Sequence, residues 1–184
     1  MHRANDRFCA EMRHIIFLIT ILLASCGKSP EEALKECMSY LDTGLIELAY
    51  PACESLLNNG NAEVQNKIGF KYINSKNPND IDKGVHWLEQ AAINGDIGAY
   101  AQLGLSYEYR PHMRDFEKAL YWYKEGALNG NELCAQNLGI IYYEGVKVEQ
   151  NYLKAEHYFS MIRELHPEYK EMLSEMKSKK GQTE

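Results

Sequence analysis

The sequence predicts an all-α fold, an α/α superhelix (solenoid) of antiparallel helix pairs. Two independent markers recur with the same period of 35 residues, which is the signature of a repeat architecture. The first marker is an apolar residue followed by glycine, with a tyrosine three positions after the glycine. It occurs at Ile68-Gly69, Leu103-Gly104 and Leu138-Gly139. The second marker is an Asn-Gly pair, which occurs at Asn59-Gly60, Asn94-Gly95 and Asn129-Gly130.

The composition is that of an ordinary globular protein and excludes few classes of function. A chain of 184 residues with 45% hydrophobic and 25% charged residues is long enough to bury one core without a metal. The formal net charge of -6 argues against sequence-independent binding to nucleic acid or to an anionic membrane surface, because both need basic patches. We therefore expect no nucleic acid among the partners.

Residues 1–25 have the pattern of a secretory signal peptide. From Met12 the chain has a basic start, then an apolar run at residues 15–23 interrupted only by Thr20, and then small residues. The run is too short to span a bilayer, which takes about 20 apolar residues. The charged residues before Met12 make a poor signal opening, so Met12 is a candidate for the true start.

The end of this segment, Leu23-Ala24-Ser25-Cys26, resembles the lipobox of bacterial lipoproteins. The resemblance implies that Cys26 becomes the acylated first residue of the mature chain and that the lipid is its only contact with the membrane. Gly27 after the cysteine, where an aspartate tends to retain the protein at the inner membrane, implies the Gram-negative outer membrane, facing the periplasm. The alternative is a cleaved signal peptide without a lipid, in which Cys26 has no role.

Residues 26–60 are predicted to form the lipidated N-terminus and a degenerate helix pair that caps the solenoid. Apolar residues repeat at helical spacing on both sides of a turn near Gly44. Cys37 and Cys53 lie at similar distances from this turn, so in an oxidising periplasm they can form a disulfide. The alternative is two buried free thiols, since cysteine is a common core residue.

Three helix pairs are expected to follow, over residues 61–96, 97–131 and 132–166. In each pair, helix A carries the Leu-Gly and tyrosine marker on one face, and helix B carries a lysine and an aromatic pair. The Asn-Gly pair is a helix stop, and the Asn or Asp after it can cap the next helix. Glycine inside helix A costs about 1 kcal/mol relative to alanine, so its recurrence indicates close approach of helix B.

The third unit resembles a Sel1-like repeat, which is related to the tetratricopeptide repeat. Residues 134–159 contain the A-x-x-L-G-x-x-Y pattern, a turn that ends in valine, Lys-Ala and an aromatic pair. The resemblance covers about residues 61–163. It departs in the turns, where Pro78 and Pro111 stand in two of them and Lys147 replaces a usual glycine in the third.

Residues 167–184 are predicted to form a C-terminal capping helix and a polar tail. His166-Pro167 interrupts the preceding helix, and apolar residues then recur on one face of a final helix. The last residues, from Lys177, are polar and are expected to fray.

No arrangement of residues typical of catalysis is found, so we expect no enzyme activity, no cofactor and no metal. His86 and His157 stand next to aromatic residues of helix B and are interpreted as packing residues, because no metal-ligand spacing surrounds them. Trp87 and Trp122 recur at one repeat position and are interpreted as core.

Helix A is expected, by the resemblance, to line the concave side of the solenoid. This places Phe70, Leu105 and Ile140 in register, with Tyr109, Tyr143 and Glu144 beside the last two. Apolar and tyrosine side chains in a groove suit a protein or peptide partner. The alternative is that so short a solenoid buries this row between its own helices.

These observations predict a non-enzymatic Sel1-repeat protein that mediates protein–protein interaction on the periplasmic side of the bacterial envelope. The alternative is an immunity protein that binds and blocks a periplasm-targeted toxin, because lipid-anchored Sel1-like proteins resemble some such partners. A hydrolase, proposed for a few Sel1-like proteins, is a third possibility that no residue here supports.

Overall fold

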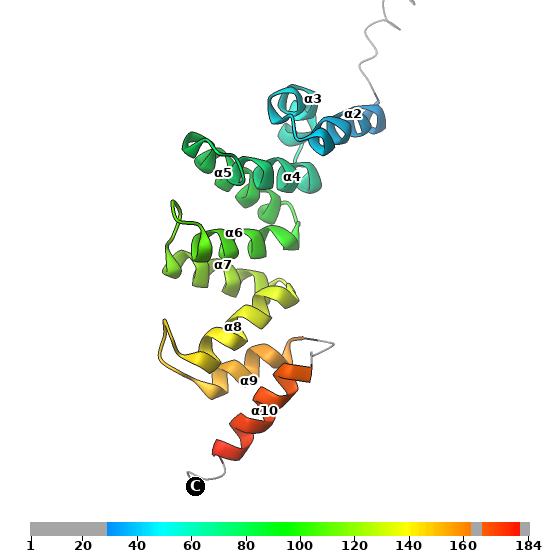
Figure 1. Cartoon of the computed structure of the whole chain (residues 1–184). Coiled ribbons are helices and arrows are strands. Elements are labelled where there is room, and N and C mark those ends of the chain that lie inside the picture. Colours follow the sequence, from blue (N-terminus) through cyan, green and yellow to red (C-terminus); the bar gives the residue numbers. More distant parts are fainter. Residues whose placement is uncertain (1–28, 163–166, 181–184) are drawn as a thin grey trace, which may run out of the picture.

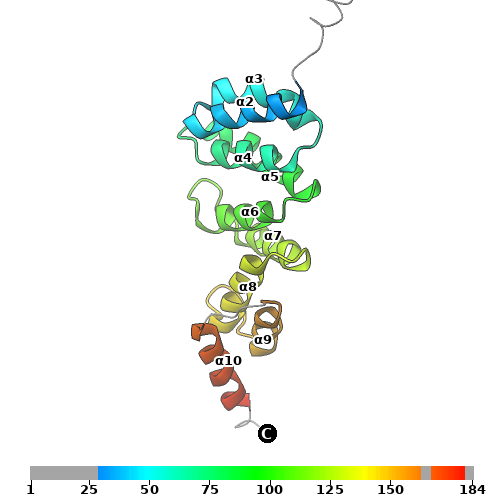
Figure 2. The ribbon, with the colours of Figure 1, turned by 90° about the vertical axis from the view of Figure 1, so that its right-hand side faces the viewer.

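The protein is a stack of antiparallel helix pairs, as the sequence predicts. The computed structural model describes residues 29–162 and 167–180, and in these residues the regular structure is helical throughout, with no strand. The helix pairs follow one another in an elongated stack in which the direction of the helices turns from pair to pair, with the N-terminal pair at one end and the last helix at the other (Figures 1 and 2). The predicted signal peptide and Cys26 lie outside the described residues.

The first pair consists of α2, Pro30–Thr43, and α3, Ile46–Asn58. The hydroxyl of Ser29 accepts a hydrogen bond from the backbone N–H of Glu32, whose carboxylate accepts one from the backbone N–H of Ser29. At its other end α2 stops at Gly44, which has a φ of 76°. The buried side chains of this pair are Cys37, Leu41, Ala49, Cys53 and Leu57, and they share one core with α4.

Three further pairs carry the repeat. They are α4, Ala62–Ile73, with α5, Ile81–Ile93; α6, Ile97–Tyr109, with α7, Phe116–Leu128; and α8, Glu132–Glu144, with α9, Tyr152–Ser160. A short 3-10 turn, η1, Pro78–Asp80, precedes α5. The Asn-Gly prediction is confirmed, since Gly95 and Gly130 have φ values of 98° and 85° after their helices. The residues that follow, Asp96 and Asn131, cap α6 and α8 with their side chains.

The first helices of successive pairs contact one another directly. Besides the contacts within each pair and with the next pair, α2 packs on α4, α4 on α6, and α6 on α8. A superhelix is most closely packed on its inner side, so the helix A row lines that side. The Asn-Gly turns and the longer turns within the repeats lie at opposite edges of the stack (Figure 1).

Helix packing accounts for the recurring glycines. A Cβ atom added at Gly69 would lie 2.9 Å from the backbone nitrogen of Leu88 in α5, and one added at Gly84 would lie 2.7 Å from the backbone nitrogen of Ile73 in α4. At Gly104 and Gly139 the added atom would instead overlap an aromatic ring of helix B, from Tyr123 and Phe159. The predicted close approach is confirmed, and in the last two repeats a ring fills the space.

Amide side chains of the Asn-Gly segments donate hydrogen bonds to the first helix of the repeat that each segment ends. The Asn94 Nδ2 donates to Gln65 Oε1 at 2.9 Å, and Asn131 Nδ2 donates to the carbonyl of Ile97 at 2.7 Å. Asn131 therefore caps α8 and holds the first helix of the preceding repeat, whereas Asn94 ties together the two helices of its own repeat. From the sequence, Asn94 and Asn131 are recognised only as residues at helix ends, and their bonds to α4 and α6 are not predicted.

The final helix, α10, Pro167–Lys180, continues the stack. Its side chains Tyr169 and Met176 are buried in the core of the last repeat, and Gln136 of α8 donates to the Tyr169 hydroxyl at 2.7 Å. Along residues 29–162 and 167–180, no helix is both long enough and apolar enough to cross a membrane.

The tryptophan side chains of helix B pack at the edge of the core and not at its centre. Trp87 and Trp122 are only partly buried, because they lie at the edge of the core against Tyr50 and Tyr100 of neighbouring helices. His86 is exposed, and its ring lies against that of Trp87 with the ring centroids 5.0 Å apart. The period of 35 residues shows where a residue recurs but not how deeply it is buried.

Candidate functional site

One face of the helix A row is not covered by other helices of the stack. We call it the helix-A face, and it is formed by every third or fourth residue of α4, α6 and α8, in rows one repeat apart. Its members are Glu63, Lys67, Phe70 and Asn74; Gly98, Gln102, Leu105 and Tyr109; and Leu133, Asn137, Ile140 and Glu144. Each of these residues is at least partly exposed.

The predicted row of Phe70, Leu105 and Ile140 lies along the middle of the helix-A face. Phe70 is 47% exposed and Tyr109 is 63% exposed, whereas Leu105 and Ile140 are half-buried against the core of the last two repeats. Phe70 of the row and its neighbour Tyr109 are thus more exposed than Leu105 and Ile140. The row is neither fully buried between the helices nor fully exposed.

Tyr143 and Glu144 differ from each other. The Tyr143 hydroxyl donates to the carboxylate of Glu175 in α10, and its ring packs on Tyr152 with the centroids 5.8 Å apart. Tyr143 therefore joins the last repeat to the C-terminal helix and lies away from the predicted row. Glu144 is exposed at the end of α8.

Beside the apolar row lies a row of amides with two unpaired atoms. Gln102 Nε2 donates to Asn66 Oδ1 at 2.8 Å across α6 and α4. One repeat later Asn137 occupies the place of Gln102, but Ala101 occupies the place of Asn66. Asn137 Nδ2 therefore has no partner at that position, and Gln102 Oε1 is also buried without a partner among the described residues. Such an atom costs about 1–3 kcal/mol.

A second cluster next to Tyr109 fixes the turn of the third repeat. Glu108 is only 8% exposed, and it accepts hydrogen bonds from the Tyr123 hydroxyl at 2.9 Å and from Lys147 Nζ at 3.1 Å. The Lys147 ammonium also lies 4.6 Å from the centre of the Phe116 ring. Burial, and then the charge of Glu108, raise the pKa of Tyr123, so its hydroxyl remains a donor. Lys147 was visible in the sequence only as a departure from the repeat pattern.

The cysteines are placed as follows. Cys37 and Cys53 are joined by a disulfide between α2 and α3, with their Sγ atoms 2.08 Å apart. Cys134 is a buried free thiol on α8, and burial raises its pKa to about 12. A thiol that stays protonated and buried is a poor nucleophile, so Cys134 is interpreted as a core residue.

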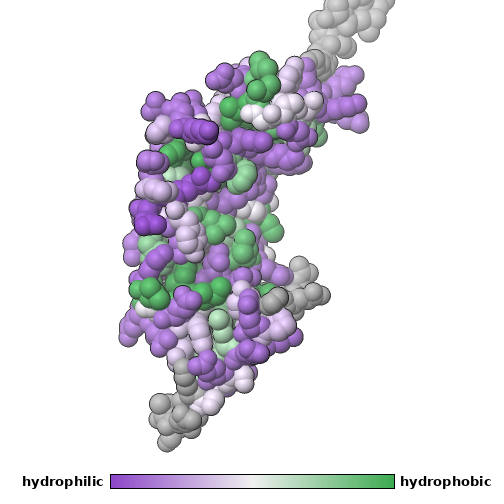
Figure 3. Space-filling model, in the orientation of Figure 1, coloured by the Kyte–Doolittle hydropathy of each residue, from purple (hydrophilic) through white to green (hydrophobic). Residues whose placement is uncertain are grey.

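In the part of the chain that the structure describes, no group of three or more His, Cys, Asp or Glu side chains is placed to hold a metal ion. The face seen in Figure 3 is mixed, with hydrophobic patches separated by hydrophilic side chains.

Comparison with known proteins agrees with the repeat period. A family model described as the Sel1 repeat matches residues 62–96, 98–131 and 133–165. The fold is similar to the crystal structure of a Sel1 repeat protein from Oxalobacter formigenes, with a TM-score of 0.58 and 23% sequence identity, over 72% of this chain and 55% of that one. This chain thus spans about half the length of that structure, and the likeness concerns the fold alone. Comparison with curated proteins found no match.

Proposed function

The chain belongs to the Sel1 repeat family, whose repeats are generally protein–protein interaction modules, and we propose that its helix-A face binds a protein partner. The observation that carries this proposal is the exposure of Phe70 and Tyr109 on a face that also carries the half-buried apolar side chains of Leu105 and Ile140. Exposed aromatic residues beside a partly buried apolar surface are typical centres of protein interfaces. The proposed role requires no catalytic group, cofactor or metal.

Replacing Phe70 and Tyr109 together by glutamate should abolish partner binding without unfolding the protein. Both side chains are largely exposed, so little packing is lost, whereas two charges at the centre of an interface cost several kcal/mol of binding free energy. The measurement is copurification of the partner from solubilised membranes, with thermal unfolding as the test of folding. Leu105→Glu and Ile140→Glu are less suitable because their half-buried side chains support the core.

The control for this experiment is Leu153→Glu. Leu153 is 62% exposed on α9 and does not belong to the helix-A face, so this variant adds a charge to a different surface. Partner recovery should equal that of the unaltered protein. If the double variant still recovered the partner in full, the helix-A face would not be the binding surface.

We place the protein at the outer membrane, facing the periplasm, anchored by a lipid on Cys26. This rests on the lipobox-like residues 23–26 and on Gly27. Helix α2 begins at Pro30, so only a few residues separate the proposed lipid from the first helix pair. That pair would be held near the membrane surface.

Replacing Cys26 by serine should move the protein from the membrane fraction to the soluble fraction. The lipid is attached through a thioether on the cysteine sulfur, and serine removes that sulfur. Incorporation of radiolabelled palmitate and fractionation of the cells are the two measurements. An unaltered protein that took up no palmitate would contradict the proposed anchor and would favour a cleaved, unlipidated signal peptide.

A second candidate is an immunity protein that blocks a toxin acting in the periplasm. The acidity of the first helix pair favours it, because residues 29–60 contain six acidic residues and a single lysine, Lys35. An acidic surface favours a basic partner. Binding to a basic toxin should weaken as salt increases, while binding centred on the apolar row should change little. A toxin gene beside this one would also favour the immunity role.

A further inference from the structure

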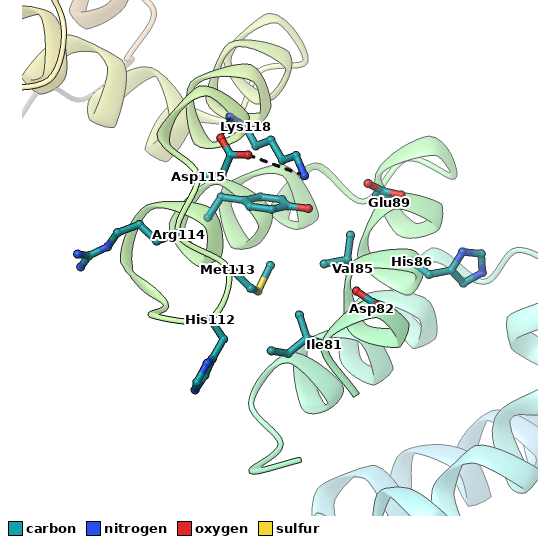
Figure 4. A pocket seen from close by; sticks show the side chains of 11 residues that line it. Ile81, Asp82, Val85, His86, Glu89, His112, Met113, Arg114, Asp115 and Lys118 are labelled. Carbon is teal, nitrogen blue, oxygen red and sulfur yellow. Dashed lines mark hydrogen bonds and ion pairs between the residues drawn. The ribbon is translucent and has the colours of Figure 1, made fainter. Parts of the chain in front are cut away.

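A cleft on a different surface separates α5 from the turn between α6 and α7. Its volume is about 420 Å³, within the usual range of ligand sites. The side chains of Ile81, Val85 and Met113 face one another across it and form an apolar floor (Figure 4). None of the residues that line this cleft belongs to the helix-A face.

Carboxylates surround the apolar floor. Asp82 and Glu89 lie on the α5 side, and no ion pair or hydrogen bond to either is found within residues 29–162 and 167–180. Asp115 lies opposite and pairs with Lys118 at 3.8 Å. His86 and Arg114 line the rim, but their side chains point away from the space between α5 and the turn (Figure 4). The unpaired charge that faces the cleft is therefore negative.

Tyr107 adds a hydroxyl to the same cleft. Its ring is covered by the ammonium of Lys118, which lies 5.2 Å from the ring centre. Burial raises the pKa of Tyr107, and the charges of Glu89, Asp115 and Asp82 raise it further. The three carboxylates are thus close enough to affect the hydroxyl, which can accept a hydrogen bond from a donor that enters between them.

From this arrangement we propose that the cleft holds a basic side chain, lysine or arginine, of a protein partner. The apolar floor suits the methylene stem of such a side chain, and Asp82 and Glu89 suit its charged end. Neutral or acidic side chains carry no positive charge that could pair with Asp82 and Glu89. The cleft would be a second contact point, separate from the helix-A face, and it does not depend on what binds there.

The test uses a lysine analogue as the probe. The full chain, labelled at the methionine methyl groups, is titrated with Nα-acetyl-lysine methylamide, and the Met113 methyl signal, assigned with Met113→Leu, is followed by NMR. We expect it to shift with a dissociation constant on the order of 1–10 mM. The norleucine analogue, which has the same stem without the ammonium, should leave the signal in place.

Variants decide whether the two carboxylates are responsible. Asp82→Asn with Glu89→Gln should weaken binding of the lysine analogue at least tenfold, while Glu54→Gln with Glu117→Gln, which removes two charges elsewhere, should not. If the double variant does not fold, the single variants Asp82→Asn and Glu89→Gln are measured in its place. Equal shifts with the norleucine analogue, unchanged binding by the Asp82/Glu89 variant, or no shift of Met113 at about 50 mM probe would each overturn the proposal.

Discussion

Replacing Gly84 by alanine is expected to lower the free energy of unfolding by about 2 kcal/mol. The added Cβ would lie 2.7 Å from the backbone nitrogen of Ile73 and 2.9 Å from the carbonyl oxygen of Gly69. Both are backbone atoms of α4, so no side chain can move aside and the two helices must separate. Overpacking of this kind costs about 3 kcal/mol, and the better helix propensity of alanine offsets about 1 kcal/mol of it.

Urea unfolding followed by circular dichroism measures this change. Gly98→Ala is the matched control, because Gly98 lies in the first turn of α6 and its added Cβ would meet side-chain atoms only, at 3.1 Å from Asp96 and 3.6 Å from Asn66. Its effect should stay within about 1 kcal/mol. If Gly84→Ala were as harmless as Gly98→Ala, close approach of α4 and α5 would not explain the glycine.

Loss of the Cys37–Cys53 disulfide is expected to cost about 3 kcal/mol, most of it in the first helix pair. The two cysteines are 16 residues apart in sequence, and both are fully buried between α2 and α3. Among the described residues the pair packs on one side only, against α4 and the Trp87 ring of α5, so little else holds it once the constraint on the unfolded chain is lost. The measurement is urea unfolding of the protein with and without reductant.

The double variant Cys37→Ser with Cys53→Ser is the control, because reductant should not change its stability further. Denatured but unreduced mature protein should show one free thiol, that of Cys134. Detection of the Cys37 and Cys53 thiols as well would show that the disulfide does not form and would favour the alternative of two free cysteines.

The period and the turn chemistry made the fold predictable from sequence. Two markers with one spacing defined the helix pairs, and the Asn-Gly pairs placed the breaks where Gly95 and Gly130 adopt positive φ. The internal glycines predicted that helices A and B approach closely, which the contacts of Gly69 and Gly84 confirm. These features are local, or are repeated often enough to be recognised.

Features that depend on contacts between repeats could not be predicted. Lys147 reaches Glu108, which is 39 positions earlier, and no periodic pattern marks that pair. Tyr143 follows the predicted row in sequence, but it turns toward Glu175 because α10 packs there. The exposure of Phe70 and the partial burial of Leu105 also differ, although the two positions are equivalent by period. The exposure of each side chain depends on the residues that pack around it, which the period does not give.

The central claim is that the helix-A face binds a protein. The most direct test places a photo-crosslinking amino acid at Phe70 or, as the control, at Leu153 of α9, and irradiates living cells. We predict that Phe70 gives a crosslink to one defined protein and that Leu153 gives none. The absence of any adduct at Phe70, or the same adducts at both positions, would contradict the claim.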